Sequence, residues 1–325
     1  MRILLLLLCV LSGPAFAACS GTNLLAQMTP DDRTRLQHDA AKQPFYNGNF
    51  WRATKDGKQV TLVGTYHLGD PRHQQMLDTI LPVLTDAKVL LVEAGPDEEA
   101  ALKARASSDP TLFIMTDTTL PTIMDPSDWD ALSLAMSRRG VPAFMAAKFQ
   151  PWYVTALLAV PPCMMAEAMD KAGLDHLVME AAKSRGVAIR GLEPYDTVFR
   201  LFETFTREDQ IAMLRASLAV EDQAEDYITT LADSYFAGES RLIWELMRDM
   251  SLSLPGYTPA QVDADLAKME QALLVTRNQG WIPVIEAESE DGPIVVAFGA
   301  LHLTGHYGIP YLLQQQGWTI SPLVP

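Results

Sequence analysis

Two apolar runs and the helical pattern between them organise the first third of the chain. Residues 60–64 and 88–93 are apolar runs of the length typical of buried strands. After Asp70-Pro71, apolar residues recur at helical spacing, at Met76, Leu77, Ile80, Leu81 and Leu84. Pro82 is an irregularity that can kink or shorten this helix. The pattern predicts a β-α-β unit, whose crossover connection makes its two strands parallel.

The same order of elements returns twice further along the chain. A helical pattern over residues 166–183 leads through a glycine-containing turn into an apolar strand over residues 187–193. Near the end of the chain, the apolar run 293–299 is followed by a short helix over 309–316 and a last strand over 318–320. Strands that alternate with helices in this way indicate an α/β fold.

Two further patterns complete the fold prediction. Residues 48–54 and 59–64 resemble strands joined at Asp56-Gly57, a dipeptide typical of tight hairpin turns, so the sheet should also contain an antiparallel pair. Residues 97–184 and 197–280 are helical in pattern and rich in methionine, which usually fills a core and can also line an adaptable groove. We therefore predict a mixed, largely parallel central sheet flanked by helices, with a large helical insertion.

The first residues have the pattern of a secretory signal peptide. Arg2 precedes an apolar run over residues 3–11, and Ala15-Phe16-Ala17 is an A-x-A cleavage pattern. The run is too short for a transmembrane helix, and no later run of about 18 uncharged apolar residues follows. We expect residues 1–17 to be removed, which leaves a single exported domain, residues 18–325, in the bacterial periplasm without a transmembrane segment.

The net charge narrows the range of partners. With 40 acidic and 25 basic residues, the chain carries a formal charge of −15 at pH 7. A strongly acidic protein is a poor partner for nucleic acids and for anionic membrane surfaces. The charge favours solubility, and attraction of cations is a second interpretation.

Cysteine use suggests one covalent link. Of three cysteines, Cys9 lies in the predicted signal peptide, and Cys19 and Cys163 remain. Two cysteines in an oxidising compartment pair readily, so we predict a disulfide that holds the new N-terminus near Pro161-Pro162. Two alternatives are unrelated thiols and a lipid anchor on Cys19, since Phe16-Ala17-Ala18-Cys19 loosely resembles a lipobox with an atypical Phe. A lipid anchor would make the protein a membrane-anchored lipoprotein.

Side chains that bind metals follow four of the predicted strands. His67 and His302 each occupy the last position of a G-x-x-H pattern after an apolar strand, and Glu93 and Glu193 each end another strand. Glycine lets the backbone turn sharply as it leaves the sheet. In an open parallel sheet, ligands bind beyond the carboxyl ends of the strands. If the four strands are neighbours, these side chains converge on one crevice.

The chemistry of these side chains suits a divalent metal. Imidazole and carboxylate together bind Mn²⁺, Co²⁺, Zn²⁺ or Fe²⁺, and such an ion can activate water. The alternative for each carboxylate is a structural ion pair, because an unpaired one beside an apolar strand is unfavourable. Sequence patterns of serine hydrolases, nucleotide-binding loops and zincins are absent. We expect exposure and no role for His38, His73, His176 and His306.

One helix carries an arginine on its apolar face. The stripe on the helix that ends near Gln279 consists of Val262, Leu266, Met269 and Leu273. The next position on it is Arg277, and a buried arginine needs a carboxylate or an anionic ligand. Glu93, Glu193 or a substrate carbonyl oxygen can serve, and the adjacent Asn278 can donate a hydrogen bond. A purely structural ion pair is the alternative.

These residues carry a resemblance to a known family. The motifs, in order along nearly the whole mature chain, are Leu62-Val63-Gly64-Thr65-Tyr66-His67, Val92-Glu93, Gly191-Leu192-Glu193, Arg277-Asn278 and Gly299-Ala300-Leu301-His302-Leu303. The segments 19–23 and 150–152 also match. The chain resembles TraB/GumN proteins, whose wider superfamily includes Tiki-type metalloproteases, pheromone-shutdown proteins, erythromycin esterase-like enzymes and haem-binding ChaN-like proteins. The resemblance implies a mixed sheet flanked by helices.

The resemblance also implies a divalent-metal site. Its ligands would be His67, His302 and Glu93, and its neighbours Glu193, Arg277 and Asn278. The Tiki-type members cut peptides near an N-terminus. We therefore expect a metal-dependent hydrolase, a peptidase of the bacterial envelope, in which Glu193 or Glu93 carries the proton and Arg277 stabilises the oxyanion. Two alternatives stay open: non-catalytic or regulatory binding of a peptide or haem, and esterase-like hydrolysis of a non-peptide substrate.

Overall fold

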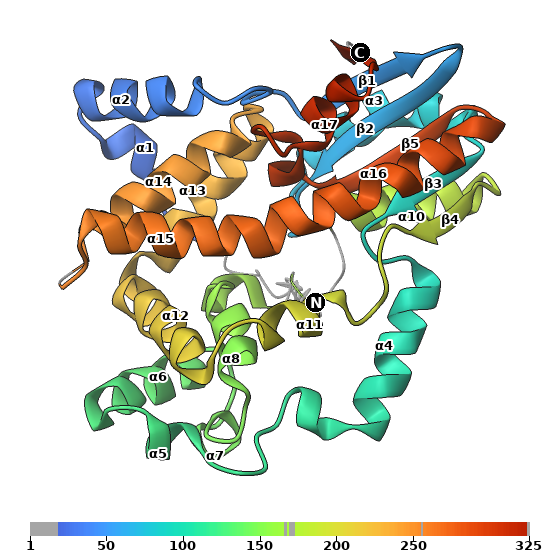
Figure 1. Cartoon of the computed structure of the whole chain (residues 1–325). Helices are drawn as coiled ribbons and strands as arrows, with labels where there is room; N and C mark the ends of the chain where they lie inside the picture. The colour runs from blue at the N-terminus through green and yellow to red at the C-terminus, as the bar shows by residue number, and fades with distance from the viewer. Residues whose placement is uncertain (1–18, 166–167, 169–172, 255, 324–325) are drawn as a thin grey trace, which may run out of the picture.

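A six-stranded mixed sheet lies at the upper right of the computed structural model in Figure 1. Its strands are β1 (Phe50–Lys55), β2 (Lys58–Thr65), β3 (Val89–Val92), β4 (Ala188–Gly191), β5 (Ile294–Gly299) and β6 (Thr319–Pro322). The structure describes residues 19–165, 168, 173–254 and 256–323. The predicted signal peptide over 1–17, and part of the predicted helix over 166–183, lie outside the described residues.

The order of the strands is β4-β3-β5-β2-β1-β6. The first four are parallel neighbours, and β1 pairs antiparallel with both β2 and β6. Strand β5, from the end of the chain, therefore lies between β2 and β3. The predicted mixed, largely parallel sheet is confirmed, and the carboxyl ends of four parallel strands meet at one edge.

A tight turn joins β1 to β2. Asp56 and Gly57 have positive φ angles of 49° and 80°, as a two-residue type I′ hairpin turn requires. The register pairs Lys55 with Lys58 across it. The hairpin predicted from the Asp-Gly dipeptide is confirmed.

One face of the sheet is covered by α16 (Thr276–Glu288) and α17 (Ile309–Gln315). Trp281 and Leu313 from these helices pack in one apolar cluster with Val296 of β5, and all three are almost fully buried. Burial of such side chains contributes about 1.5–3 kcal/mol each. This packing holds α16 over the sheet and so fixes the positions of the residues that α16 carries, among them Arg277 and Asn278.

The other face of the sheet is covered by three helices. They are α3 (His73–Thr85), α10 (Leu174–Ser184) and α13 (Ala224–Phe236). Leu84 and Val178 pack there against Val295 of β5. Helix α3 begins two residues after the predicted Asp70-Pro71 cap, with Pro82 inside it. Helices α10 and α13 lie within the predicted helical region 97–184 and 197–280, but both pack on the sheet and so belong to this layer and not to the insertion.

The helical insertion lies below the sheet in Figure 1 and has its own apolar core. Its helices are α4 (Pro96–Ser108), η1 (Pro110–Leu112), α5 (Leu120–Ile123), α6 (Pro126–Arg138), α7 (Ala143–Ala146), α8 (Pro151–Leu158), α11 (Thr197–Glu203), α12 (Arg207–Ala219) and η3 (Glu221–Gln223). Met136, Val154 and Leu214 are fully buried in this core. One isolated bridge, between Ile114 and Phe149, is the only strand-like pairing outside the named strands of the described chain.

The N-terminal segment packs beside the sheet, at the upper left of Figure 1. The helices there are α1 (Leu24–Gln27), α2 (Pro30–Ala40) and α14 (Ser240–Leu252). The predicted disulfide is confirmed: Cys19 bonds to Cys163 in η2 (Pro162–Met164). The Cys19 sulfur in this bond is not available for a lipid. None of the described helices is long and apolar enough to span a bilayer.

Candidate functional site

The carboxyl edge of the parallel strands brings the predicted side chains together. His67 lies two residues beyond β2, Glu93 follows β3 directly, and Glu193 lies two residues beyond β4. After β5 the chain makes the short turn η6 (Ala300–Leu303), which buries His302 to 4% exposure. Because β5 lies between β2 and β3, His302 stands between the ends that carry His67 and Glu93.

Gly299 marks the point on which three of these side chains converge. A Cβ atom there would lie 3.4 Å from both Glu93 Oε1 and His67 Nε2, and 3.8 Å from His302 Cδ2. The Gly299 N–H also donates a hydrogen bond to Glu93 Oε1 at 2.7 Å. A glycine at this position therefore keeps a small space between two imidazoles and a carboxylate.

Arg277 reaches the site from a long helix that crosses the front of the molecule in Figure 1. The helix consists of α15 (Pro259–Glu270), a π-helical turn over Gln271–Val275, and α16. The prediction that it ends near Gln279 is wrong, since it continues to Glu288 past Pro283. The wider π turn changes which residues face the sheet, and such turns are frequent at functional sites.

The guanidinium of Arg277 contacts three of the predicted side chains. It donates to Glu93 Oε2 at 2.5 Å and to both oxygens of Glu193, at 2.6 Å from Nη2 to Oε1 and 3.0 Å from Nε to Oε2. Its Nη1 also lies 3.3 Å from His302 Nε2. Both glutamates that the sequence offered as candidate partners of Arg277 therefore contact it.

Asn278 sets the orientation of His302. Its amide nitrogen donates to the carbonyl of Tyr307 at 2.8 Å, so its Oδ1 faces His302 Nδ1 at 2.5 Å. Nδ1 must then carry the proton, which leaves the lone pair of Nε2 directed into the site. A carbonyl partner of this kind is the usual arrangement behind a metal-binding imidazole.

The pKa values of His302 and Glu93 are both lowered, for different physical reasons. Burial lowers the pKa of His302 to about 3, so its imidazole is neutral at physiological pH. Burial alone would raise the pKa of Glu93, but His302, Arg277, His67 and the Gly299 N–H lower it to about 2. Because His302 is neutral, we attribute most of that lowering to the positive charges of Arg277 and His67, with a smaller part from the Gly299 N–H. The site thus presents a neutral imidazole beside a carboxylate.

His67 occupies the mouth of the site and has a different partner. Its Nδ1 lies 3.5 Å from Asp175 Oδ2, and 62% of its side chain is exposed. The loss of solvation lowers the pKa of His67, but Asp175 and Glu93 outweigh it and raise the pKa to about 9. Water at the exposed side of the ring screens part of this effect. Asp175 lies at the start of α10 and was not predicted, since nothing in its local sequence links it to His67.

Trp281 is a second residue that the sequence analysis missed. Its indole N–H donates to Glu193 Oε2 at 2.9 Å, and its ring lies 4.9 Å from the Arg277 guanidinium carbon and 4.5 Å from the His302 ring. Trp281 stands four residues after Arg277, on the same face of α16. The spacing of four residues could have predicted that Trp281 lies beside Arg277.

A cavity of about 220 Å³ opens at the side chains of His67 and Glu93. Its lining includes Thr65, His67, Glu93, Asp175 and His176. The expectation that His176 is exposed is wrong, because it is half-buried in this lining. His73 is also buried, at 1% exposure, and its Nε2 contacts the carbonyl of Leu68 at 2.8 Å.

The donor set suits a divalent metal. Two imidazoles and a carboxylate around the space at Gly299 are ligands that first-row metals prefer. Thr65 Oγ1 and Asp175 Oδ1, both buried beside the cavity, have no hydrogen-bond partner among the described residues. As the described side chains stand, no three histidine, cysteine or acidic groups are close enough together to hold an ion.

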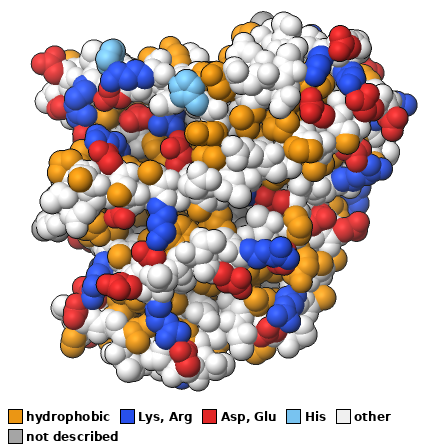
Figure 2. All heavy atoms as spheres, in the orientation of Figure 1, with side chains coloured by type: hydrophobic (Ala, Val, Ile, Leu, Met, Phe, Trp, Pro, Cys, Tyr) orange, Lys and Arg blue, Asp and Glu red, His pale blue; other side chains and the backbone are white. Residues whose placement is uncertain are grey.

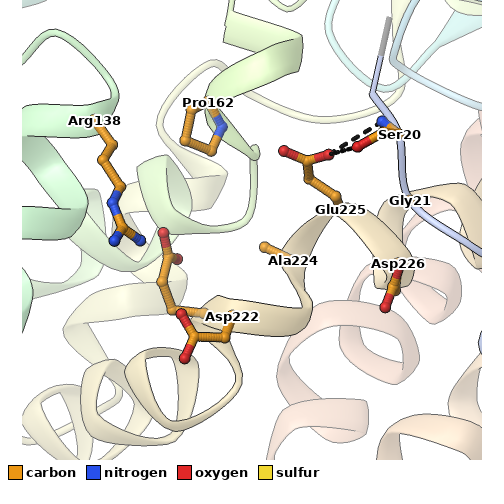
Figure 3. Close-up of a pocket in the computed structure, with 9 residues that line it drawn as sticks. Ser20, Gly21, Arg138, Pro162, Asp222, Ala224, Glu225 and Asp226 are labelled. Carbon is orange, nitrogen blue, oxygen red and sulfur yellow. Dashed lines mark hydrogen bonds between the residues drawn. The ribbon is translucent and has the colours of Figure 1, made fainter.

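A second, larger hollow lies near the disulfide and contains none of the predicted site residues. Its volume is about 610 Å³, and Figure 3 shows residues that line it, including Arg138, Asp222 and Glu225. Glu225 accepts hydrogen bonds from the backbone and hydroxyl of Ser20.

On the face seen in Figure 2, acidic and basic side chains are interspersed with apolar ones. We call the hollow near the disulfide the N-terminal hollow, and the group of His67, Glu93, Glu193, Arg277, Asn278 and His302 the strand-end site.

Comparison with known proteins identifies the family. No curated protein matches the chain at a significant level. The model of the TraB/PrgY/gumN family matches residues 49–322, a range that contains every strand of the sheet and every residue of the strand-end site. A match over most of the chain, in the order in which the motifs occur, is what membership requires. The chain therefore belongs to the TraB/PrgY/gumN family.

Proposed function

We propose that the strand-end site is the active centre of a metal-dependent hydrolase, with His67, Glu93 and His302 as the metal ligands. The observation that supports this most is the space at Gly299, faced by Glu93 Oε1 and His67 Nε2 at equal distances and by the ring of His302. A bound Mn²⁺, Co²⁺, Zn²⁺ or Fe²⁺ would supply a Lewis acid that lowers the pKa of water.

The neighbouring residues suit the remaining tasks. Arg277 holds a positive charge at the site, where it can stabilise the oxyanion that develops on a substrate carbonyl. Both oxygens of Glu193 accept hydrogen bonds from Arg277, and one also from Trp281, so we assign Glu193 to holding Arg277 in place. Glu93 lines the cavity and Glu193 does not, so we assign proton transfer to Glu93.

The dimensions of the cavity favour a small reacting group. Cavities for drug-sized ligands measure about 300–1,000 Å³, whereas this one measures about 220 Å³. A peptide bond with one adjacent side chain suits this space better than haem does. We therefore propose a peptidase, and the Cys19–Cys163 disulfide supports an oxidising compartment such as the periplasm.

A peptide-library assay with the purified mature protein tests this function. Wild type would be loaded with each of the four metals and compared with the double variant His67→Ala/His302→Ala. The exposed His38 provides a matched control, His38→Ala. We expect cleavage by wild type and by the control, and a fall in kcat/KM of at least about 100-fold in the double variant.

Other results of the same assay favour the alternatives. Full peptide cleavage by the double variant would contradict the proposed site. Hydrolysis of esters without cleavage of peptides would favour the esterase-like alternative. Saturable peptide or haem binding without turnover would favour a sequestering or regulatory protein.

A further inference from the structure

Arg277 contacts two of the three side chains proposed to bind the metal, His302 through Nε2 and Glu93 through Oε2. Its Nη1 lies 3.3 Å from His302 Nε2, the ring nitrogen that Asn278 leaves free to accept. Its Nη2 donates to Glu93 Oε2 at 2.5 Å, while Oε1 accepts from the Gly299 N–H. A cation and this guanidinium therefore compete for the same two side chains.

Arg277 has a second set of contacts that involves no metal ligand. Its Nε lies 3.1 Å and 3.0 Å from the two oxygens of Glu193, and its guanidinium carbon lies 4.9 Å from the centre of the Trp281 ring. Trp281 in turn fixes Glu193 through its indole N–H. The Nε end of the arginine is therefore held independently of Glu93 and His302.

These two sets of contacts suggest an exchange of cations. We propose that Arg277 is an internal counter-cation of the strand-end site: it binds Glu93 and His302 when no metal is present, and releases both when a divalent cation binds. Glu193 and Trp281 keep the Nε end in place during this exchange. The released Nη groups remain at the edge of the site, where they can contact a substrate oxygen. This inference rests on the proposed metal site, and it implies that displacement of Arg277 lowers the affinity for the metal.

The physical reason for such a device is the burial of charge. The side chains of Arg277, Glu193 and Glu93 are only 12%, 10% and 22% exposed. Two carboxylates at that depth are unfavourable without a neighbouring cation. An arginine that neutralises them keeps the metal-free protein folded, and it lowers the affinity for any metal that must displace it.

Titration calorimetry with Zn²⁺ and with Mn²⁺ tests the exchange. The variants are Arg277→Ala, which removes the competing cation, and Arg190→Ala, which makes the same change in net charge at an exposed pair with Glu288. We expect Arg277→Ala to bind metal about tenfold or more tightly than wild type, and Arg190→Ala to match wild type. Circular dichroism would confirm that each variant is folded.

A small guanidinium provides the complementary measurement. Methylguanidinium should fill the space left in Arg277→Ala and weaken its metal binding competitively, with no effect on wild type. If Arg277→Ala fails to fold, Arg277→Gln keeps hydrogen-bond donors without the charge and should still bind metal more tightly than wild type.

The outcomes separate this inference from the proposed function. Tighter binding by the Arg277 variants, with sensitivity to methylguanidinium, would support the exchange. Metal binding by wild type with equal or weaker binding by folded Arg277 variants would overturn the exchange and leave the metal site standing. Failure of wild type and of both variants to bind any metal would overturn the proposed function, and the exchange with it.

Discussion

Two buried arginines in different regions of the molecule show how similar chemistry serves different ends. Arg139, in the helical insertion, is fully buried and pairs with Glu221 beside the N-terminal hollow. Its other donors satisfy backbone carbonyls, among them those of Leu157, Leu158 and Val160 at the end of α8. Each of these contacts closes a helix end or balances a charge, so the role of Arg139 is structural.

Arg277 differs in what surrounds it. Its partners include an imidazole and two carboxylates that follow parallel strands, and one of these partners, Glu93, lines a cavity. The N-terminal hollow is larger, at about 610 Å³ against about 220 Å³, yet Glu221 in its lining pairs with Arg139, and Glu225 and Asp226 accept hydrogen bonds from the backbone of Ser20 and Thr22. The comparison teaches that the kind of buried group beside a cavity indicates function better than the volume of the cavity.

The largest expected effect concerns the carboxylates that pair with the two arginines. Glu93→Gln should lower kcat/KM for peptide hydrolysis by about 10²–10⁴-fold, because it removes both a ligand and the proposed proton carrier. Glu221→Gln makes the same chemical change beside Arg139 and should leave kcat/KM unchanged. Steady-state assays on folded, metal-loaded proteins measure kcat/KM. An equal fall in kcat/KM in both variants would contradict the assignment of different roles to the two regions.

The converse experiment removes the structural arginine. Arg139→Met leaves Glu221 and several carbonyls near the end of α8 without a donor, and should reduce the free energy of unfolding by about 3–5 kcal/mol. Metal affinity should not change, because Arg139 contacts no residue of the strand-end site. Urea unfolding and calorimetry measure the two quantities. A changed metal affinity in folded Arg139→Met would show that the regions are coupled.

Gly299→Ala sharpens the assignment of the metal position. The added Cβ would lie 3.4 Å from Glu93 Oε1 and His67 Nε2, an ordinary contact distance, so stability should be retained. The methyl group would nevertheless fill the space between the ligands, and metal affinity should fall about tenfold or more. Gly280→Ala, in open space on α16, is the matched control. Unaltered metal affinity in Gly299→Ala would place any metal elsewhere.

The smallest expected effect is the pH dependence due to His67. Its pKa is raised in the folded state from 6.5 to about 9, so its stabilising contribution is complete below pH 6.5 and is lost as the pH rises through 9. Urea unfolding of the metal-free protein should show a decline in stability over this range, reduced in Asp175→Asn. Metal affinity should rise over the same range, since a ligand must lose its proton. The same decline in Asp175→Asn as in wild type would exclude the Asp175–His67 pair as its source.

The sequence predicted those parts of the fold that depend on local pattern. The apolar run before His67 and the Asp56-Gly57 turn specify β2 and its hairpin without reference to the rest of the chain. The two G-x-x-H patterns and the strand-end glutamates predicted which side chains meet, because parallel strands share a carboxyl edge. Arg277 followed from its place on an apolar stripe.

Features that depend on tertiary packing could not be predicted in this way. The insertion of β5 between β2 and β3 determines which strand ends are adjacent, and no local pattern encodes it. Asp175 contacts His67 only because α10 packs over the same edge of the sheet. His73 is buried only because α3, which it begins, packs on the sheet. The π turn before Arg277 shifts the helix face, which spacing at regular helical periodicity does not reveal.

Metal stoichiometry tests the central claim most directly. The mature protein and its His67→Ala/His302→Ala variant would be exposed to Mn²⁺, Co²⁺, Zn²⁺ and Fe²⁺ and desalted, and their metal content would be measured by inductively coupled plasma mass spectrometry. The strand-end site predicts about one metal ion per folded wild-type chain and none in the variant. Equal metal content in both, or no metal in folded wild type, would contradict it.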